Sequence, residues 1–247
     1  MKSLFGFTRA VVTSRYALLT PDGFVNSVLP GWSGSTCVVL ISPALGAKFT
    51  QWLITLTKDG RGVGHTDGME LFAYVLDGDC TLTLSRKKHH LMNGSFAFLP
   101  PLTDYEFSKV AEGTRLLIFQ KVYQPLDGLK DYEPIIDQAS EHPDVPFQGD
   151  PDARLQTLLP DQPEFDMAVN IFTYQPGATL PIVETHLMEH GMMMLSGQGI
   201  YRLDKDWHPV KAGDVIWLAP YCPQWFVAMG KTPASYIYYK DVNRSPM

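Results

Sequence analysis

The chain has 247 residues, of which 45% are hydrophobic and 19% are charged. These proportions are ordinary for a folded globular protein and exclude a disordered or fibrous chain. The net charge of −6 argues against nucleic acid as the main partner, because nucleic acid binding requires a basic face.

No apolar run in the sequence approaches the ~18 residues of a membrane span, so no membrane partner is expected. The three cysteines, Cys37, Cys80 and Cys222, are too few and too scattered for a disulfide framework or a CxxC metal site. A reducing compartment, the cytoplasm, is therefore the expected location.

Short strands separated by turns account for most of the first half of the chain. Residues 51–57 (QWLITLT) form an apolar run that is typical of a strand. Residues 74–84 (YVLDGDCTLTL) combine an apolar run, a turn at Gly78 and an alternating run, which is the pattern of a β-hairpin. With 20 Gly and 19 Pro spread along the chain, the pattern predicts an all-β sandwich or barrel, a group that includes jelly rolls and cupins.

The second half of the chain repeats the first. Residues 193–203 (MMLSGQGIYRL) form a second hairpin pattern, and residues 212–220 (AGDVIWLAP) resemble residues 93–101 (NGSFAFLPP). An offset of 119 residues relates both pairs of segments without a gap. A repeat of this kind is the signature of duplicated architecture.

The repeat predicts two homologous β domains, residues 1–122 and residues 167–247. Residues 123–166 are rich in Asp, Glu and Pro and have weak periodicity. We expect this stretch to be an inter-domain linker with one short helix near residues 135–140.

The strongest chemical signal is the segment ETHLMEH, residues 184–190. On a strand, Glu184, His186 and His190 share one face, because their positions have the same parity. A carboxylate and two imidazoles on one face suit a divalent metal, and Gln224 on the return strand can supply a fourth donor. The alternative is a set of polar residues on a solvated strand. Glu189 has the opposite parity and is expected on a solvated face.

The first copy of the repeat lacks this donor set. Subtracting 119 places His65, Asp67, Leu71 and Tyr105 at the corresponding positions. A Leu and a Tyr cannot complete a metal site of this type, so we expect one metal site, in the second copy. His65, Asp67 and Glu70 are interpreted as residues of a solvated loop, with weak ligand binding as the alternative.

Two residues of the last strand, Tyr236 and Lys240, share parity and can also face the site. A Lys inside a barrel is unfavourable unless it meets an anion, so a substrate carboxylate is a natural partner. The alternative places Lys240 in solvent at the strand end. Tyr201, on the strand after the second hairpin, also has the position to point inward, although an aromatic residue there is more often part of the core.

At these residues the chain resembles a bicupin, which has two tandem jelly-roll barrels. Residues 177–197 resemble the first cupin motif and residues 213–224 the second. The ligand set departs from the usual one, because Glu184 replaces the first His, His190 replaces the Glu and Gln224 replaces the His of the second motif.

This altered set is similar to that of the (S)-ureidoglycine aminohydrolases. The segments TPDG (residues 20–23), LSGQGIY (residues 195–201) and YKDVNR (residues 239–244) extend the resemblance. It covers about residues 16–244 and is densest in the second copy. Membership in this family implies a manganese enzyme of purine (allantoin) catabolism that converts (S)-ureidoglycine and water into (S)-ureidoglycolate and ammonia.

The resemblance also implies roles for individual residues. The manganese ligands of the family correspond to Glu184, His186, His190 and Gln224, one Mn²⁺ per chain. Its substrate contacts correspond to Glu184, Gln224, Tyr236 and Lys240, with Tyr201 nearby. The first cupin domain of the family is not expected to bind metal. We expect Lys240 to hold the substrate carboxylate, Glu184 to move protons and Tyr236 to complete a chiral pocket.

Two alternatives from other classes stay open. A carboxylate with two His also suits a cupin-type Fe(II) dioxygenase, although Gln224 fills a position that O₂ chemistry would use. A non-catalytic bicupin that binds a small anion or a sugar is the other, because a fold alone does not fix a function. Exposed β edges predict self-association into a homo-oligomer.

Overall fold

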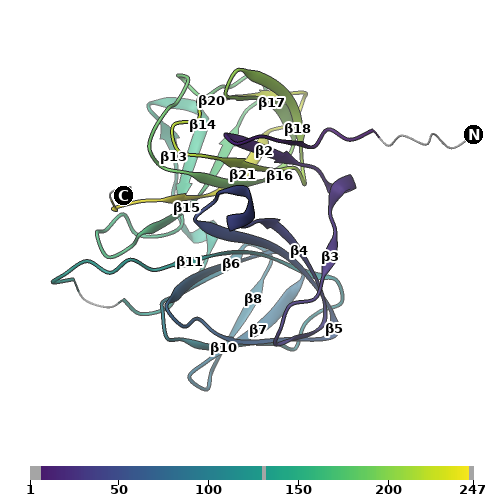
Figure 1. Ribbon diagram of the computed structural model, residues 1–247, viewed down its shortest axis with the longest axis vertical. Coiled ribbons are helices and arrows are strands. Elements are labelled where there is room, and N and C mark those ends of the chain that lie inside the picture. Colours follow the sequence, from purple (N-terminus) through teal and green to yellow (C-terminus); the bar gives the residue numbers. More distant parts are fainter. Residues whose placement is uncertain (1–6, 130–131, 245–247) are drawn as a thin grey trace, which may run out of the picture. The chain divides into compact units, whose positions relative to one another are not determined.

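The structure, a computed structural model, describes residues 7–129 and 132–244. The predicted all-β class is confirmed, because the described residues form β-strands and three short 3-10 helices (Figure 1). The helices are η1 (Pro21–Gly23), η2 (Pro43–Leu45) and η3 (Ala139–Glu141). None of the helices in the described residues is long and apolar enough to cross a membrane.

The chain divides into two compact units. We call them the N-terminal unit, residues 25–143 and 161–166, and the C-terminal unit, residues 1–24, 144–160 and 167–247.

The N-terminal unit is built on one 10-stranded sheet, which curves into a barrel (Figure 1). Eight strands run in the order β12-β9-β6-β11-β5-β10-β7-β8, while β4 pairs with β5 and β3 pairs with β4. Alternating apolar residues such as Leu71, Ala73 and Val75 fill its interior. The strands are β3 (Asn26–Ser27), β4 (Trp32–Ile41), β5 (Phe49–His65), β6 (Met69–Asp77), β7 (Asp79–Leu84), β8 (Lys87–Met92), β9 (Ser95–Leu99), β10 (Asp104–Ser108), β11 (Thr114–Val122) and β12 (Ile135–Gln138).

The C-terminal unit combines an 8-stranded sheet, in the order β1-β2-β19-β16-β21-β15-β14-β13, with a 3-stranded sheet, β18-β17-β20. Side chains from both sheets, among them Leu18, Tyr201 and Phe226, share one core. The strands are β1 (Val11–Val12), β2 (Tyr16–Leu19), β13 (Asp144–Phe147), β14 (Asp150–Thr157), β15 (Met167–Tyr174), β16 (His190–Ser196), β17 (Gln198–Leu203), β18 (Asp206–Lys211), β19 (Val215–Leu218), β20 (Gln224–Met229) and β21 (Ala234–Asp241).

The repeat is visible in the strand pairing. Leu71 pairs with Leu99 in the N-terminal unit, and His190 pairs with Leu218 at the same offset of 119 residues in the C-terminal unit. The hairpin glycines Gly78 and Gly197 both have positive φ, 78° and 69°. A Cβ at Gly197 would lie 2.5 Å from the carbonyl oxygen of Pro233, so the turn requires glycine.

The unit boundaries differ from the domains expected from the repeat. Strand β2, drawn purple in Figure 1, pairs with β19, so the first residues of the chain complete the C-terminal unit instead of the N-terminal one. Tyr16 anchors this strand, because its hydroxyl donates to Asp206 Oδ2 over 2.9 Å and lies 3.1 Å from His208 Nε2.

The stretch expected as a linker is mostly built into the two units. Strand β14 pairs with β15 and β13 pairs with β14, which places residues 144–157 in the sheet of the C-terminal unit. Residues 135–138 form strand β12, paired with β9, where a helix was expected. The short helix η3 does follow at Ala139–Glu141, but it begins later than expected, because the edge of β9 offers backbone partners to residues 135–138 that the local sequence does not reveal.

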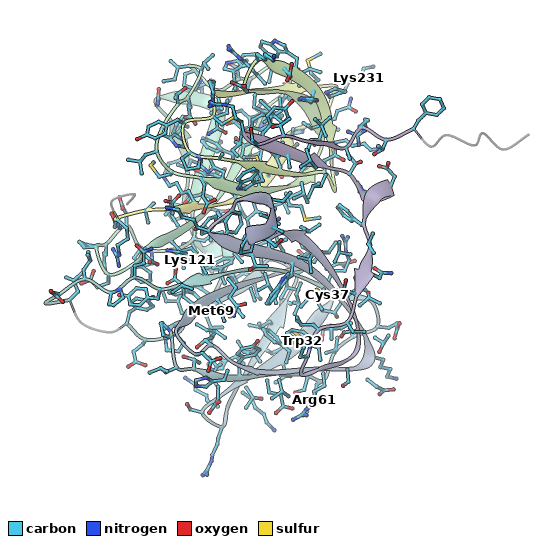
Figure 2. The ribbon with its side chains drawn as sticks, viewed as in Figure 1. Trp32, Cys37, Arg61, Met69, Lys121 and Lys231 are labelled. Atoms are coloured by element: carbon cyan, nitrogen blue, oxygen red, sulfur yellow. The ribbon has the colours of Figure 1, made fainter. Side chains whose placement is uncertain are left out.

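A buried polar cluster fixes residues 161–166 within the N-terminal unit. The Lys121 ammonium, labelled in Figure 2, lies 2.8 Å from Asp166 Oδ2, and the Tyr132 hydroxyl donates to Glu70 Oε2 over 2.7 Å. Burial raises the pKa of Glu70 well above its usual value, and the neighbouring Asp166 adds to the shift. Glu70 therefore favours its neutral form. The expectation that Glu70 lies in a solvated loop was wrong, because it is on strand β6 and its side chain is buried.

Candidate active site

A cavity of about 130 Å³ lies in the barrel of the C-terminal unit. The residues that the sequence predicted for the site all line it, namely Glu184, His186, His190, Tyr201, Gln224, Tyr236 and Lys240. The remaining lining side chains are Phe147, Leu155, Phe172, Met188, Met192 and Tyr238. The cavity suits a small molecule and places polar groups among aromatic walls, as ligand sites commonly do.

Glu184 and His186 lie on an irregular segment, residues 175–189, and not on the regular strand that the parity argument assumed. An isolated bridge joins Glu184 to Gln224 through two backbone hydrogen bonds of 2.9 Å. The Tyr221 N–H donates to the His186 carbonyl over 2.7 Å. These backbone bonds, together with strand β16 that begins at His190, bring the three side chains together.

The two imidazoles meet through their Nε2 atoms, which lie 3.1 Å apart. Each Nδ1 faces a backbone carbonyl, that of Met188 for His186 at 3.1 Å and that of Tyr239 for His190 at 3.2 Å. A carbonyl only accepts, so each Nδ1 carries the proton and each Nε2 presents a lone pair. The Glu189 N–H in turn donates to Asp241 Oδ1 over 2.7 Å, which holds the chain next to Met188 in place.

The facing lone pairs favour a bound cation. Burial lowers the pKa of His186 and lowers that of His190 well below its usual value, so a shared proton is disfavoured. Nitrogens that bind one ion at about 2.1 Å lie roughly 3.0 to 3.4 Å apart for octahedral or tetrahedral angles. The observed separation fits this range. The carbonyl contacts are also the usual outer partners of metal-binding His residues.

The oxygen donors lie beside the imidazoles. Gln224 Nε2 is 3.3 Å from His186 Nε2 and 3.5 Å from Glu184 Oε2, and a half-turn of its amide would present Oε1 instead. Within residues 7–129 and 132–244, no three His, Cys, Asp or Glu side chains are close enough to bind a metal as they stand. The donor set fits a divalent ion, provided that the Glu184 carboxylate turns toward the imidazoles.

Charge and burial determine the state of Glu184. Burial raises the pKa of its carboxyl group, and the nearby Lys240 ammonium opposes the shift. Lys240 is half-buried in the cavity wall and makes no ion pair with any other described residue. The site therefore offers one positive group to an incoming anion.

Buried phenols form the floor of the cavity. The Tyr201 hydroxyl donates to Gln224 Oε1 over 2.8 Å, and the hydroxyls of Tyr174 and Tyr236 lie 3.2 Å apart. Burial raises the pKa of Tyr201 and of Tyr236 well above the usual value, so both stay neutral. These phenols can orient a ligand by hydrogen bonds without adding charge.

The corresponding positions inside the N-terminal barrel lack the metal-binding side chains. Leu71 occupies the place of His190, Leu82 that of Tyr201 and Tyr105 that of Gln224. His65 Nδ1 lies 2.9 Å from Asp67 Oδ1, and both side chains are solvent-accessible. The polar chemistry in the described barrels is thus concentrated in the C-terminal unit.

The expectation for Glu189 was wrong. Its side chain is buried, with 1% of the residue exposed, and its carboxylate accepts a hydrogen bond from Trp217 Nε1 at 3.3 Å. The parity argument correctly turned Glu189 away from the metal donors. It erred in assuming that the opposite face of the sheet is solvated.

Three further lining residues were not predicted from the sequence, namely Tyr238, Phe147 and Leu155. Tyr238 shares the parity of Tyr236 and Lys240, a signal that would have found it. Phe147 and Leu155 come from the stretch expected as a linker, where the alternation of Ala153 and Leu155 in strand β14 was the available clue.

Comparison with known proteins identifies the family of the chain. The Cupin domain family matches residues 170–239. The (S)-ureidoglycine aminohydrolase of Arabidopsis thaliana is 38% identical over 248 residues, which cover 100% of this chain and 82% of that protein. The chain belongs to the (S)-ureidoglycine aminohydrolase family.

Bacterial relatives support the assignment. The (S)-ureidoglycine aminohydrolase of Escherichia coli K12 is 38% identical over 96% of this chain and 92% of its own length. The crystal structure of protein Ylba from E. coli superposes with a TM-score of 0.87 and 34% identity, covering 97% of this chain and 96% of that one. The resemblance seen in the sequence, including its bicupin fold, is therefore confirmed.

Proposed function

We propose that this enzyme hydrolyses (S)-ureidoglycine to (S)-ureidoglycolate and ammonia with a bound Mn²⁺ ion. The observation that carries the proposal is the pair of imidazole lone pairs, 3.1 Å apart, beside Glu184, Gln224 and the ammonium of Lys240. The names of the relatives supply the reaction. His186, His190, Gln224 and Glu184 would hold the ion, and imidazole, amide and carboxylate donors suit manganese.

Lys240 fixes the orientation of the substrate in this proposal. The substrate carries an amine, a ureido group and a carboxylate on one carbon, and the carboxylate is its only strong anion. A half-buried ammonium without an ionic partner among the described residues binds such a group by charge-assisted hydrogen bonds. That contact places the reacting carbon over the imidazoles and Glu184.

Glu184 handles the protons. Its buried position raises the pKa of the carboxyl group, which improves it as an acid without preventing it from acting as a base. As a base it accepts a proton from the water whose oxygen bonds to the carbon, and as an acid it gives a proton to the nitrogen that leaves as ammonia. The same roles serve direct displacement and the route in which ammonia leaves first and water adds to an imine.

A bound divalent ion would supply Lewis-acid polarisation and a template for water and substrate. The aromatic walls exclude bulk water, and the neutral Tyr236 gives the pocket a third fixed point besides Lys240 and the metal-binding group. Three fixed points distinguish the two hands of a substrate with four different substituents. The proposal therefore includes formation of a single hand of the product, (S)-ureidoglycolate.

The test is ammonia release from (S)-ureidoglycine generated in place from allantoate, because the compound decomposes spontaneously. Metal-free protein is compared with protein given Mn²⁺, and circular dichroism follows the handedness of the product. We expect manganese-dependent release of ammonia and (S)-ureidoglycolate, and its loss in Glu184→Ala. Substantial turnover by Glu184→Ala would contradict the proton-transfer role.

Release no faster than the spontaneous rate, from folded and metal-loaded protein, would overturn the proposal. Oxygen uptake with ferrous iron would then indicate the dioxygenase alternative. Tight binding of a small anion or sugar without turnover would indicate the binding module.

Location and assembly are part of the proposal. The free, buried thiols of Cys37, Cys80 and Cys222 support a reducing compartment, for which we propose the cytoplasm. Edge strands such as β8 and β13, where Val145 is 48% exposed, support a homo-oligomer. Light scattering on a size-exclusion column would test the assembly, and a monomer at micromolar concentration would contradict it.

A further inference from the structure

Tyr238 lies in the cavity wall between two residues already assigned to the site. It occupies the middle of strand β21, where Tyr236, Tyr238 and Lys240 all face the cavity. Successive inward positions on a strand are about 6.6 Å apart. Tyr238 is thus one step from Lys240, and its ring packs edge-on against His190 with 5.3 Å between ring centroids.

Asn170 determines what the Tyr238 hydroxyl can do. The two residues pair across strands β15 and β21, and Asn170 Nδ2 donates to the Tyr238 oxygen over 3.0 Å. This bond uses an acceptor position of the phenol, so the hydroxyl hydrogen has to point elsewhere.

The cost of burying Asn170 supports this role. Asn170 is 4% exposed, and its Oδ1 has no hydrogen-bond partner among the described residues. An unsatisfied buried amide oxygen is destabilising, and such groups call for an explanation. The hydrogen bond that Asn170 does make goes to Tyr238, which indicates that the orientation of the Tyr238 hydroxyl is important for the site.

We propose that Tyr238, held by Asn170, is a hydrogen-bond donor that binds the ureido carbonyl oxygen of the substrate. The inference rests on the proposed function, because it assigns the second polar end of the same substrate. Lys240 binds the substrate carboxylate. Tyr238 is the next inward residue along the strand and binds the carbonyl oxygen of the ureido group, which is bonded to the same central carbon as the carboxylate. A Tyr238 hydroxyl that is held as a hydrogen-bond donor favours a substrate carbonyl oxygen and disfavours a substrate group that is itself a donor.

A pair of matched ligands separates this role from general packing. Ureidoacetate keeps the carboxylate and the ureido carbonyl. Guanidinoacetate has a similar shape, but a positively charged guanidinium group places a donating nitrogen where that oxygen would lie. We expect the Mn²⁺-loaded wild type to bind ureidoacetate at least tenfold more tightly by isothermal titration calorimetry. Tyr238→Phe should weaken ureidoacetate binding roughly tenfold, the size of one neutral hydrogen bond, and change guanidinoacetate binding by less than about twofold.

Two substitutions of Asn170 test the positioning. Asn170→Asp places only oxygen acceptors or an acid against Tyr238, so it draws the hydroxyl hydrogen away from the cavity and should remove the preference for ureidoacetate as fully as Tyr238→Phe does. Asn170→Leu keeps the volume and leaves the hydroxyl free to donate, so most of the preference should persist. A purely structural role predicts the opposite order, with Leu at least as harmful as Asp.

Tyr16→Phe is the matched control, because it removes another buried hydroxyl of the same unit outside the cavity. Its ligand preference should equal that of the wild type. An unchanged preference in Tyr238→Phe, with ureidoacetate still bound, would overturn this inference alone. Failure of the wild type to bind ureidoacetate or to turn over (S)-ureidoglycine would overturn the proposed function as well.

Discussion

At the scale of single residues, Lys240 shows how burial gives one charge a specific use. The ammonium lies among aromatic rings and two neutral imidazoles, and its charge lowers the pKa of Glu184 and of both His residues. Through these contributions Lys240 favours the unprotonated forms of Glu184, His186 and His190. Its own charge has no ionic partner among the described residues and is available to an anion.

Lys240→Met should therefore separate substrate binding from metal binding. The variant keeps the aliphatic stem but loses the charge, so we expect KM for (S)-ureidoglycine to rise about 10- to 100-fold, as for a lost charge-assisted hydrogen bond. Manganese affinity, measured from the free-ion signal in electron paramagnetic resonance, should not fall, because the variant keeps the four proposed ligands and removes a nearby positive charge. Lys231→Met, at an exposed position labelled in Figure 2, is the control. A wild-type KM in Lys240→Met would contradict the assignment.

The sequence predicted which residues line the cavity, but not all of the backbone contacts that bring them together. Strand parity correctly grouped Tyr236 with Lys240, and it would have added Tyr238. It does not explain Glu184 and His186, which lie on an irregular segment held by backbone bonds to Gln224 and Tyr221. Those bonds join residues 35 to 40 positions apart, so a local sequence pattern cannot predict them. Their proposed roles as ligands stay predictions.

At the scale of strands, the placement of β2 makes the N-terminal segment part of the unit that holds the cavity. Leu18 on this strand is fully buried and packs in the same core as Met192 and Leu218. The sequence of β2, YALL, is apolar throughout and has no alternation that selects a sheet. Its partner β19 lies about 200 residues away, so a local pattern could not predict this pairing.

Leu18→Ala tests this arrangement. Truncating a fully buried leucine lowers the free energy of unfolding by about 2 to 5 kcal/mol, and the loss should fall on the C-terminal unit. Hydrogen exchange followed by mass spectrometry should show faster exchange in β16 and β19, with β5 and β6 unchanged. Val12→Ala, at a position 58% exposed, should have no measurable effect. Equal acceleration in both units would contradict the assignment of β2.

At the scale of the whole molecule, the chain passes between its two units more than once. Residues 161–166 return to the N-terminal unit, where Asp166 meets Lys121, and Glu70 lies beside them with Tyr132. The repeat predicted two barrels. It could not predict the return of residues 161–166 to the N-terminal unit, because the other copy has no corresponding return.

The cluster should make stability depend on pH. Because the pKa of Glu70 is raised in the folded state, the protein binds more protons folded than unfolded. The contribution of Glu70 to the free energy of unfolding is therefore fully present below the usual carboxyl pKa of about 4.3. It is lost as the pH rises through the raised pKa of the folded state. Glu70→Gln should flatten this dependence in urea unfolding of the N-terminal unit, followed by its Trp32 and Trp52. The same slope in the variant would show that another group is responsible.

The pairing of β2 with β19 also sets an order of events during synthesis. Residues 25–143 contain nearly all of the N-terminal unit, so it can fold while the rest of the chain is still being made. Strand β2 leaves the ribosome earlier, yet its partner, Val215–Leu218, emerges almost 200 residues later. The edge of β2 that binds β19 stays unpaired for most of translation, and the barrel that holds the cavity is completed only when Val215–Leu218 has been synthesised.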